Sequence, residues 1–259
     1  MEENGLCVNP GKSEIVQAED ECYHCYAIKT KVVTQEDTLA DIVGLYAKPF
    51  LKKGDILFLS EKMVACTQGR AIPLSSIKPG FFAGLLSGFV TRSNAGIGLA
   101  MPETMQCAID ECGLVRILLA SAAGIVGKLC KRKGWFYKVA GYRAASIDGP
   151  CGYTIPPYNQ FVVLAPLNPD LAAANISKML DDVAVLIVDV NDLGANILGS
   201  SKTMDRDRMI SLLRQNPLGQ SAESTPMGIL RASSRKEPAN IHQYRSPKTG
   251  YFNIKMPPA

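Results

Sequence analysis

The sequence lacks an uninterrupted apolar run long enough to cross a membrane; the small, apolar residues 113–127 form a short stretch that contains Arg116. The first residues, MEENGLCVNPGKSE, have neither the basic nor the apolar region of a signal peptide. The sequence also lacks a large excess of either charge. Its 28 Lys and Arg residues nearly balance its 24 Asp and Glu residues and give a net charge of +4. We therefore expect a cytoplasmic protein that binds neither a membrane nor nucleic acid.

A second cysteine pair of the kind that completes a zinc site is also missing. The eight cysteines are scattered through the chain, and Cys22 and Cys25 form the only Cys-x-x-Cys pair. A zinc site needs four ligands, and only Cys7 lies near this pair in sequence. We interpret most of the cysteines as buried free thiols, and metal or redox chemistry at Cys22 and Cys25 as the third of three functional hypotheses.

The segment Pro10-Gly11-Lys12-Ser13 lacks the partner glycine that a phosphate-binding P-loop requires. Position 6, five residues before Gly11, is a leucine, and no strongly apolar strand precedes the segment. The sequence therefore excludes a P-loop of this type.

The composition of the 259-residue chain is that of an ordinary globular protein, with 47% hydrophobic and 20% charged residues. Strand and helix patterns follow each other without a regular βαβ rhythm, which predicts an α+β fold with mixed or antiparallel sheets and packed helices. Strands are predicted over residues 26–33, 56–59, 161–165, 183–188 and 227–230, with a further one from Trp135. Helices are predicted over residues 38–47, 102–112, 168–180 and 204–215, and a core helix over 113–130, with Thr38 and Asn168 as caps.

Two carboxylates and an amide follow the apolar strand predicted at residues 183–188. Asp189, Asn191 and Asp192 lie within four residues, just before a glycine. Acids gather at low cost only where water, a cation or a basic partner is present, and oxygen ligands suit magnesium or manganese. An Asx-rich turn, whose side chains bond their own backbone, explains the same residues equally well. Asp148, in a turn predicted at residues 146–150, is a further candidate ligand.

A lysine follows the apolar strand predicted at residues 56–59. Lys62 comes after Ser60 and Glu61, where it could reach a phosphate as a point charge. The alternative is a surface lysine at a strand-to-helix joint. Residues 91–98 offer several backbone and hydroxyl donors that suit an anion, or form a plain tight connection.

Taken in order, several short motifs resemble the gamma-glutamyl ligase of the deazaflavin coenzyme factor 420. They lie at residues 54–70, 94–97, 186–194, 218–220 and 225–231, and their order is stronger evidence than any one of them. The resemblance divides the chain into an N-terminal extension (1–26), a glutamyl ligase-like domain (27–231) and a C-terminal tail (232–259).

This resemblance implies an enzyme that joins glutamate to an acid through an acyl phosphate, using GTP and a divalent metal. It implies an α+β fold, a homodimer, and a nucleotide and a small carboxylate as partners. Lys62 and Asp192 would be catalytic. The implied nucleotide contacts are Thr30, Lys31, Val32, Val33, Glu61, Lys62 and Gln220, and the implied Mg²⁺ or Mn²⁺ ligands are Asp148, Asp189, Asn191 and Asp192.

The sequence departs from the family pattern at several positions. Gly98, Met101, Cys66 and Asn191 stand where the family has a metal-binding aspartate, an asparagine, a lysine and a second aspartate. We therefore expect a divergent member, with a non-catalytic nucleotide- or small-anion-binding protein as the alternative. The tail carries apolar anchors that predict a place in a dimer interface, at Ile241, Tyr244, Tyr251, Phe252 and Ile254.

Overall fold

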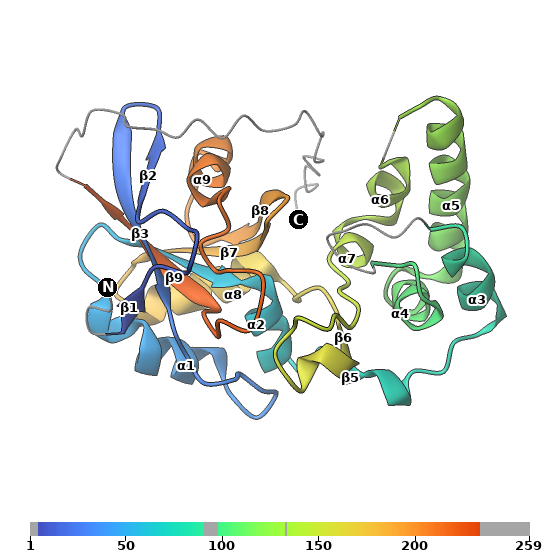
Figure 1. Ribbon diagram of the computed structural model, residues 1–259, viewed down its shortest axis with the longest axis horizontal. Coiled ribbons are helices and arrows are strands. Elements are labelled where there is room, and N and C mark those ends of the chain that lie inside the picture. Colours follow the sequence, from blue (N-terminus) through green and yellow to red (C-terminus); the bar gives the residue numbers. More distant parts are fainter. Residues whose placement is uncertain (1–4, 91–97, 133, 234–259) are drawn as a thin grey trace.

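A mixed sheet forms the centre of the protein (Figure 1) in the computed structural model, which describes residues 5–90, 98–132 and 134–233. Its strands are ordered β1-β3-β9-β4-β7-β8, and β2 also pairs with β3. Only β4 and β7 run parallel; the other neighbours are antiparallel. The predicted α+β fold with a mixed sheet is confirmed. The strands are β1 (Leu6–Cys7), β2 (Ile15–Ala18), β3 (Glu21–Ile28), β4 (Ile56–Ser60), β7 (Ala184–Asn191), β8 (Gly194–Ser200) and β9 (Met227–Ala232).

Helices cover both faces of this sheet because its central strands are apolar on both sides. Leu57 and Leu59 of β4 pack on one face with α1 (Leu39–Tyr46), α8 (Pro169–Met179) and the start of α2 (Glu61–Thr67). Phe58, which points the other way, packs with α9 (Arg206–Leu213). Figure 1 shows α9 on the opposite side of the sheet from α1 and α8. A short 3-10 helix, Lys48–Phe50, follows α1.

A second group of helices, the helical lobe (residues 74–160), is inserted between two short antiparallel strands, β5 (Ala71–Pro73) and β6 (Phe161–Val163). It forms the right half of Figure 1 and has its own core around Met105, Ile117 and Leu99. Its elements are the 3-10 helices Leu74–Ser76 and Tyr158–Gln160, and α3 (Phe81–Ser87), α4 (Pro102–Cys112), α5 (Leu114–Leu129), α6 (Trp135–Ala140) and α7 (Tyr142–Ala145).

A partly buried ion-pair network ties the helical lobe to the connection that leads into β5. Arg70 pairs with Glu111 of α4 at 2.6 Å, and Arg143 of α7 reaches the same carboxylate oxygen at 2.7 Å. The Arg70 Nε also donates to the carbonyl of Ala165 at 2.5 Å. These contacts hold α4 and α7 beside the strands that lead to the functional site.

Several sequence-based predictions need correction. The strand expected at residues 26–33 is β3, which ends at Ile28 because Thr30 turns to donate its N–H to Ser224 at 2.9 Å. The strand expected from Trp135 is helix α6. The predicted core helix is α5, but only Ile117, Ala120 and Gly127 of it are buried.

Other predictions are confirmed, in part with different details. Helix α1 begins after Thr38, whose hydroxyl accepts from the Asp41 N–H at 3.1 Å. Helix α8 follows Asn168 as expected, but the Asn168 side chain makes no capping bond and its backbone is left-handed, with φ of 45°. Residues 234–259 of the C-terminal tail and residues 91–97 lie outside the described residues, so the predictions made for them are untested.

Within the described part of the chain, no single helix is long and apolar enough to cross a membrane. Helices α4 and α5 taken together have the length and apolar composition of a membrane span, but they are bent by 117° where they join.

Candidate functional site

The parallel pairing of β4 and β7 brings two carboxylates from distant parts of the chain to one sheet edge. Ser60 at the end of β4 pairs with Val188 of β7, so Glu61 and Asp189 each come directly after this pair. Glu61 is the first residue of α2 and is only 4% exposed. The carboxyl ends of parallel strands are a common place for ligand sites.

Lys62 and Asp148 complete this group, which we call the acidic site (Glu61, Lys62, Asp148 and Asp189). The Lys62 ammonium pairs with the Asp148 carboxylate at 2.8 Å, and the Lys62 side chain is 48% exposed. Asp148 comes from the end of the helical lobe, where its backbone N–H and C=O both bond to Val163 at 2.9 Å. The site is therefore built from the sheet and the helical lobe together. Lys62 does lie at a strand-to-helix joint, between β4 and α2, and its contact with phosphate stays a prediction.

The charges of the acidic site are not balanced. Burial raises the pKa of Glu61 well above its usual range, and the nearby Asp189 and Asp148 charges raise it further. Burial, and then Asp148, raises the pKa of Asp189 to about 6. The Asp148 carboxylate is the main cause of a raised pKa at Lys62. Glu61 Oε2 is buried and has no hydrogen-bond partner among the described residues. Three carboxylates thus surround one ammonium.

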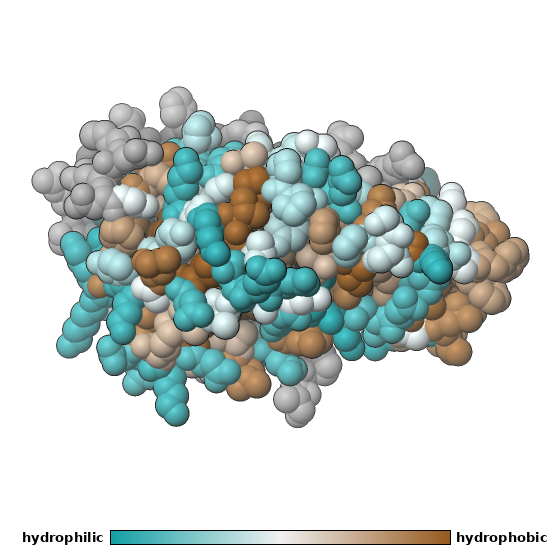
Figure 2. Space-filling model, turned by 90° about the horizontal axis from the view of Figure 1, so that it is seen from below, coloured by the Kyte–Doolittle hydropathy of each residue, from teal (hydrophilic) through white to brown (hydrophobic). Residues whose placement is uncertain are grey.

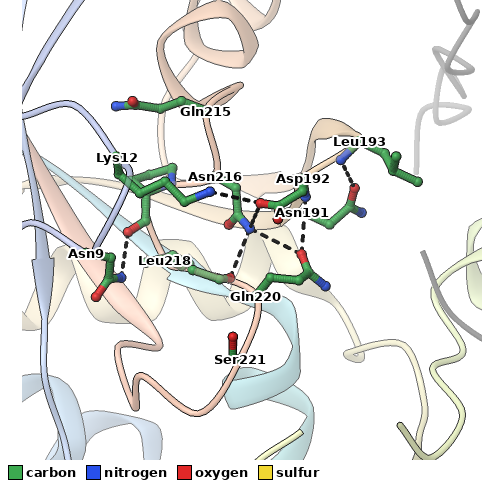
Figure 3. A network of polar contacts seen from close by, with 12 residues as sticks. Asn9, Lys12, Asn191, Asp192, Leu193, Gln215, Asn216, Leu218, Gln220 and Ser221 are labelled. Carbon is green, nitrogen blue, oxygen red and sulfur yellow. Dashed lines mark hydrogen bonds and ion pairs between the residues drawn. The ribbon is translucent and has the colours of Figure 1, made fainter. Parts of the chain in front are cut away.

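Asp192 does not share the contacts of Asp189, contrary to the expected cluster of ligands. Strand β7 runs to Asn191, so the turn is only Asp192-Leu193 and successive side chains point to opposite faces. Asp192 Oδ1 accepts from Lys12 Nζ at 2.9 Å and from Asn216 Nδ2 at 3.0 Å (Figure 3). These bonds, chiefly that from Lys12, lower the pKa of Asp192.

Asn191 lies between the two groups. Its side-chain oxygen accepts from the Leu193 N–H at 2.9 Å, which is the local bond of an Asx turn. Its side chain also bonds to Asp189 and lowers the pKa of that residue. The Asx-turn interpretation therefore describes part of this stretch, and the metal-site interpretation stays a prediction.

Gln220 connects the β7–β8 turn with Tyr153 of the helical lobe. Its Oε1 accepts from the Asp192 N–H at 3.1 Å and from Asn216 Nδ2 at 3.2 Å. The same side chain bonds to Tyr153, and the charge of Lys62 acts on Tyr153 as well. Gln220, predicted to contact a nucleotide, thus lies beside Tyr153, on which the Lys62 charge also acts.

The predicted nucleotide-binding segment, residues 30–33, follows β3 as an irregular stretch. Thr30 is buried, and Lys31 forms an ion pair with Asp37 at 2.6 Å. Val33 is buried, and its carbonyl accepts from the Tyr158 hydroxyl at 2.6 Å. The contact of a nucleotide with Thr30, Lys31, Val32 and Val33 stays a prediction.

Sequence reasoning missed several residues of this region. Lys12 was considered only as part of a P-loop, and neither Asn216 nor Tyr153 was singled out. Lys12 lies 180 positions from Asp192, so no local pattern signals their contact. The one available signal was the Asn216-Pro217 pair at the end of α9, since asparagine tolerates the left-handed conformation observed there, φ 54°.

A cavity of about 380 Å³ lies elsewhere, beside the carboxyl end of β8. It shares no residue with the acidic site. Its lining is Asp170, Leu186, Ile197, Ser200, Ser201, Lys202, Thr203, Met204 and Arg206.

The structure gives no support to a zinc site at the Cys-x-x-Cys pair. Cys22 and Cys25 are both buried and lie three residues apart in β3, so their side chains point to opposite faces of the sheet. Burial raises the pKa of the Cys25 thiol to about 12. Among the described residues, no group of three or more His, Cys, Asp or Glu side chains has the arrangement of a metal site.

The fold and the acidic site define an α+β protein in which buried and half-exposed charges gather between a sheet and an inserted helical lobe. The family model described as F420-0:Gamma-glutamyl ligase matches residues 27–196, and the chain belongs to this family. No curated protein matches the chain. Lys62, Asp148 and Asp189 lie within the matched residues, whereas Lys12 and Gln220 lie outside them.

Proposed function

We propose that the protein is a gamma-glutamyl ligase-like enzyme that depends on a nucleotide and a divalent cation and forms its amide through an acyl phosphate. GTP would be the co-substrate, and glutamate and a small carboxylate would be joined. The observation that carries this proposal is the acidic site, in which three carboxylates surround the single ammonium of Lys62.

The residues of the acidic site fit a magnesium or manganese ion. Glu61, Asp148 and Asp189 offer only oxygen, and with Lys62 they sum to a charge of −2 when all are ionised, which one divalent ion balances. Protein sites for Mg²⁺ typically supply one or two carboxylates and leave the other positions to water and phosphate. Asp148 and Asp189 would hold the ion. Two protein ligands are enough for such a site, so a group of three clustered ligands is not needed. The ion would neutralise charge on the phosphates.

Lys62 would act on the transferred phosphoryl group. In the first step this group passes from the nucleotide to a carboxylate oxygen of the acid, giving a nucleoside diphosphate and an acyl phosphate. In the second step the glutamate amine attacks the acyl carbon, and phosphate leaves as the amide forms. The half-exposed Lys62 ammonium is a flexible point charge, so it can stabilise the negative charge on the phosphoryl group in both steps.

The contacts of Asp192 favour an anchoring role for this residue over the predicted catalytic and metal-binding roles. Its charge is already compensated by Lys12, so it adds little negative charge to the acidic site.

A thermal-shift screen of GTP and ATP, each with and without magnesium, tests the proposal. A ligand present at 100 times its dissociation constant adds about 2.7 kcal/mol to the free energy of unfolding, because only the folded state binds it. We expect a rise in melting temperature that requires nucleotide and metal together. A rise with nucleotide alone would favour the non-catalytic binding protein, and no rise with either nucleotide would contradict both interpretations.

We also propose a homodimer that forms through the helical lobe. Large apolar side chains of α3 and α5 are exposed there, including Phe81 (78%) and Leu129 (79%). Figure 2 shows apolar side chains gathered at this end of the molecule. Exposed apolar patches of this kind mark association surfaces.

Light scattering tests this dimer. We expect a dimeric mass for the full chain and a monomeric mass for the double variant Leu119→Glu/Ile125→Glu, because both side chains lie on the exposed face of α5. Leu45→Glu, at an equally exposed position on α1, is the control and should leave the mass unchanged. A monomeric full chain would rule out the dimer.

A further inference from the structure

We propose that Lys12 is a positioning residue, which holds the side chain of Gln220 in one orientation through Asp192 and Asn216. Residues 9–13, which we call the N-terminal clamp, lie outside the part of the chain that the family model matches. The identity of the ligand that Gln220 would contact rests on the proposed function. The positioning of Gln220 by Lys12 does not depend on it.

The N-terminal clamp is fixed on both sides of Lys12. The Asn9 Nδ2 donates to the Pro217 carbonyl and to the Thr225 hydroxyl, both at 2.9 Å. Ser13 exchanges two bonds with the Gln215 side chain, at 2.7 and 2.8 Å. All these partners belong to residues 215–225, the loop that carries Gln220. The clamp therefore spans this loop and directs Lys12 between its anchors.

The Lys12 side chain is largely shielded from solvent, whereas its partner Asp192 is 56% exposed. The Lys12 side chain is only 17% exposed, and its Nζ lies 2.9 Å from Asp192 Oδ1. A lysine gives up this much hydration only where its charge is paired. The ion pair ties the exposed two-residue turn at Asp192 and Leu193 to the clamp.

Asn216 transmits this restraint to Gln220. It is completely buried, and its Nδ2 lies within hydrogen-bond distance of Asp192 Oδ1, Gly219 O and Gln220 Oε1, at 3.0, 2.9 and 3.2 Å. All three are acceptors that share the two N–H groups of Nδ2, so only the orientation that points Nδ2 at them forms these bonds. Figure 3 shows Lys12, Asp192, Asn216 and Gln220 pointing toward one another.

The contacts with Asn216 and Asp192 fix the orientation of the Gln220 side-chain amide. Its oxygen accepts from Asn216 and from the Asp192 N–H, so its NH₂ group is the end left to bond to Tyr153. An NH₂ group presented in this way recognises an oxygen acceptor, such as a carbonyl or phosphate oxygen of a nucleotide. If Lys12 releases the turn, the Gln220 amide can rotate and present its oxygen, which repels such a ligand.

The test is nuclear magnetic resonance of the Gln220 side-chain amide in the full chain without nucleotide. Lys12→Met keeps the length of the side chain and removes its charge, Lys12→Arg restores the charge, and Lys53→Met is the control at an exposed turn. We expect the order parameter of this amide to fall from a rigid value of about 0.85 to below about 0.6 in Lys12→Met. Lys12→Arg and Lys53→Met should retain the rigid value. An equally rigid amide in Lys12→Met would overturn the proposal.

A second measurement separates this proposal from the proposed function. If the wild type binds GTP with magnesium, Lys12→Met should weaken that binding about tenfold, with recovery in Lys12→Arg, as for the loss of one oriented hydrogen bond. If the wild type binds no nucleotide, the proposed function fails and the amide order parameter alone decides the role of Lys12. Asp192→Asn breaks the same ion pair and replaces Lys12→Met should that variant not fold.

Discussion

Replacing Lys62 by methionine is expected to weaken nucleotide binding by about 10- to 100-fold, which corresponds to the loss of one charge-assisted contact of about 1.5–3 kcal/mol. The reason is the charge balance of the acidic site. Without the ammonium, Glu61, Asp148 and Asp189 present only negative charge to an incoming phosphate. Ligase turnover should fall further than binding, because charge on the transferred group grows in the transition state.

Calorimetric titration of GTP with magnesium measures this effect. Lys53→Met removes an exposed lysine from the turn before β4, at the other end of that strand from Lys62, and is expected to bind like the wild type. Equal affinities for wild type and Lys62→Met would show that Lys62 is only the surface lysine of the alternative interpretation.

Asp189→Asn is expected to stabilise the metal-free protein while removing its metal-dependent activity. The pKa of Asp189 is raised from 3.8 to about 6, so the folded state binds a proton more tightly than the unfolded state. Ionisation of Asp189 therefore costs stability as the pH rises from about 4 to 6, and the full cost is present at neutral pH. Asparagine removes this cost, which is on the order of 2–3 kcal/mol.

Urea unfolding in the presence of a chelator, at neutral pH and below about pH 4, checks the prediction. The stability gain of Asp189→Asn should be present at neutral pH and vanish in acid. Asp192→Asn is the matched control with the opposite sign, because Lys12 lowers the pKa of Asp192 and stabilises its ionised form. An Asp189→Asn protein that is less stable at neutral pH would refute the account of the acidic site.

The elements that the sequence predicted well have a strong local signal. The apolar runs Ile56–Leu59 and Val183–Val188 became the parallel pair at the centre of the sheet, and Thr38 caps its helix as expected. Strand β8 was missed because its residues mix glycine and polar side chains with few apolar ones. Helix α2 was missed because its apolar residues are buried all along its short length and leave no amphipathic period.

The site was predictable only in part, because its contacts join residues far apart in the chain. Lys62 and Asp148 were both proposed from sequence, but their ion pair depends on how the helical lobe returns to the sheet. The burial of Glu61 follows from the pairing of β4 with β7, which no local pattern reveals. The separation of Asp192 from Asp189 follows from strand alternation, once β7 is known to extend to Asn191.

The central claim is that nucleotide and cation bind together at the acidic site. Titration of Mn²⁺ followed by electron paramagnetic resonance, with and without GTP, tests it most directly, because coupled ligands raise each other's affinity by the same factor. The account predicts that GTP tightens Mn²⁺ binding by at least about tenfold in the wild type, and that Asp189→Asn and Lys62→Met both remove this coupling. Mn²⁺ binding that is independent of GTP, or coupling that survives in both variants, would contradict it.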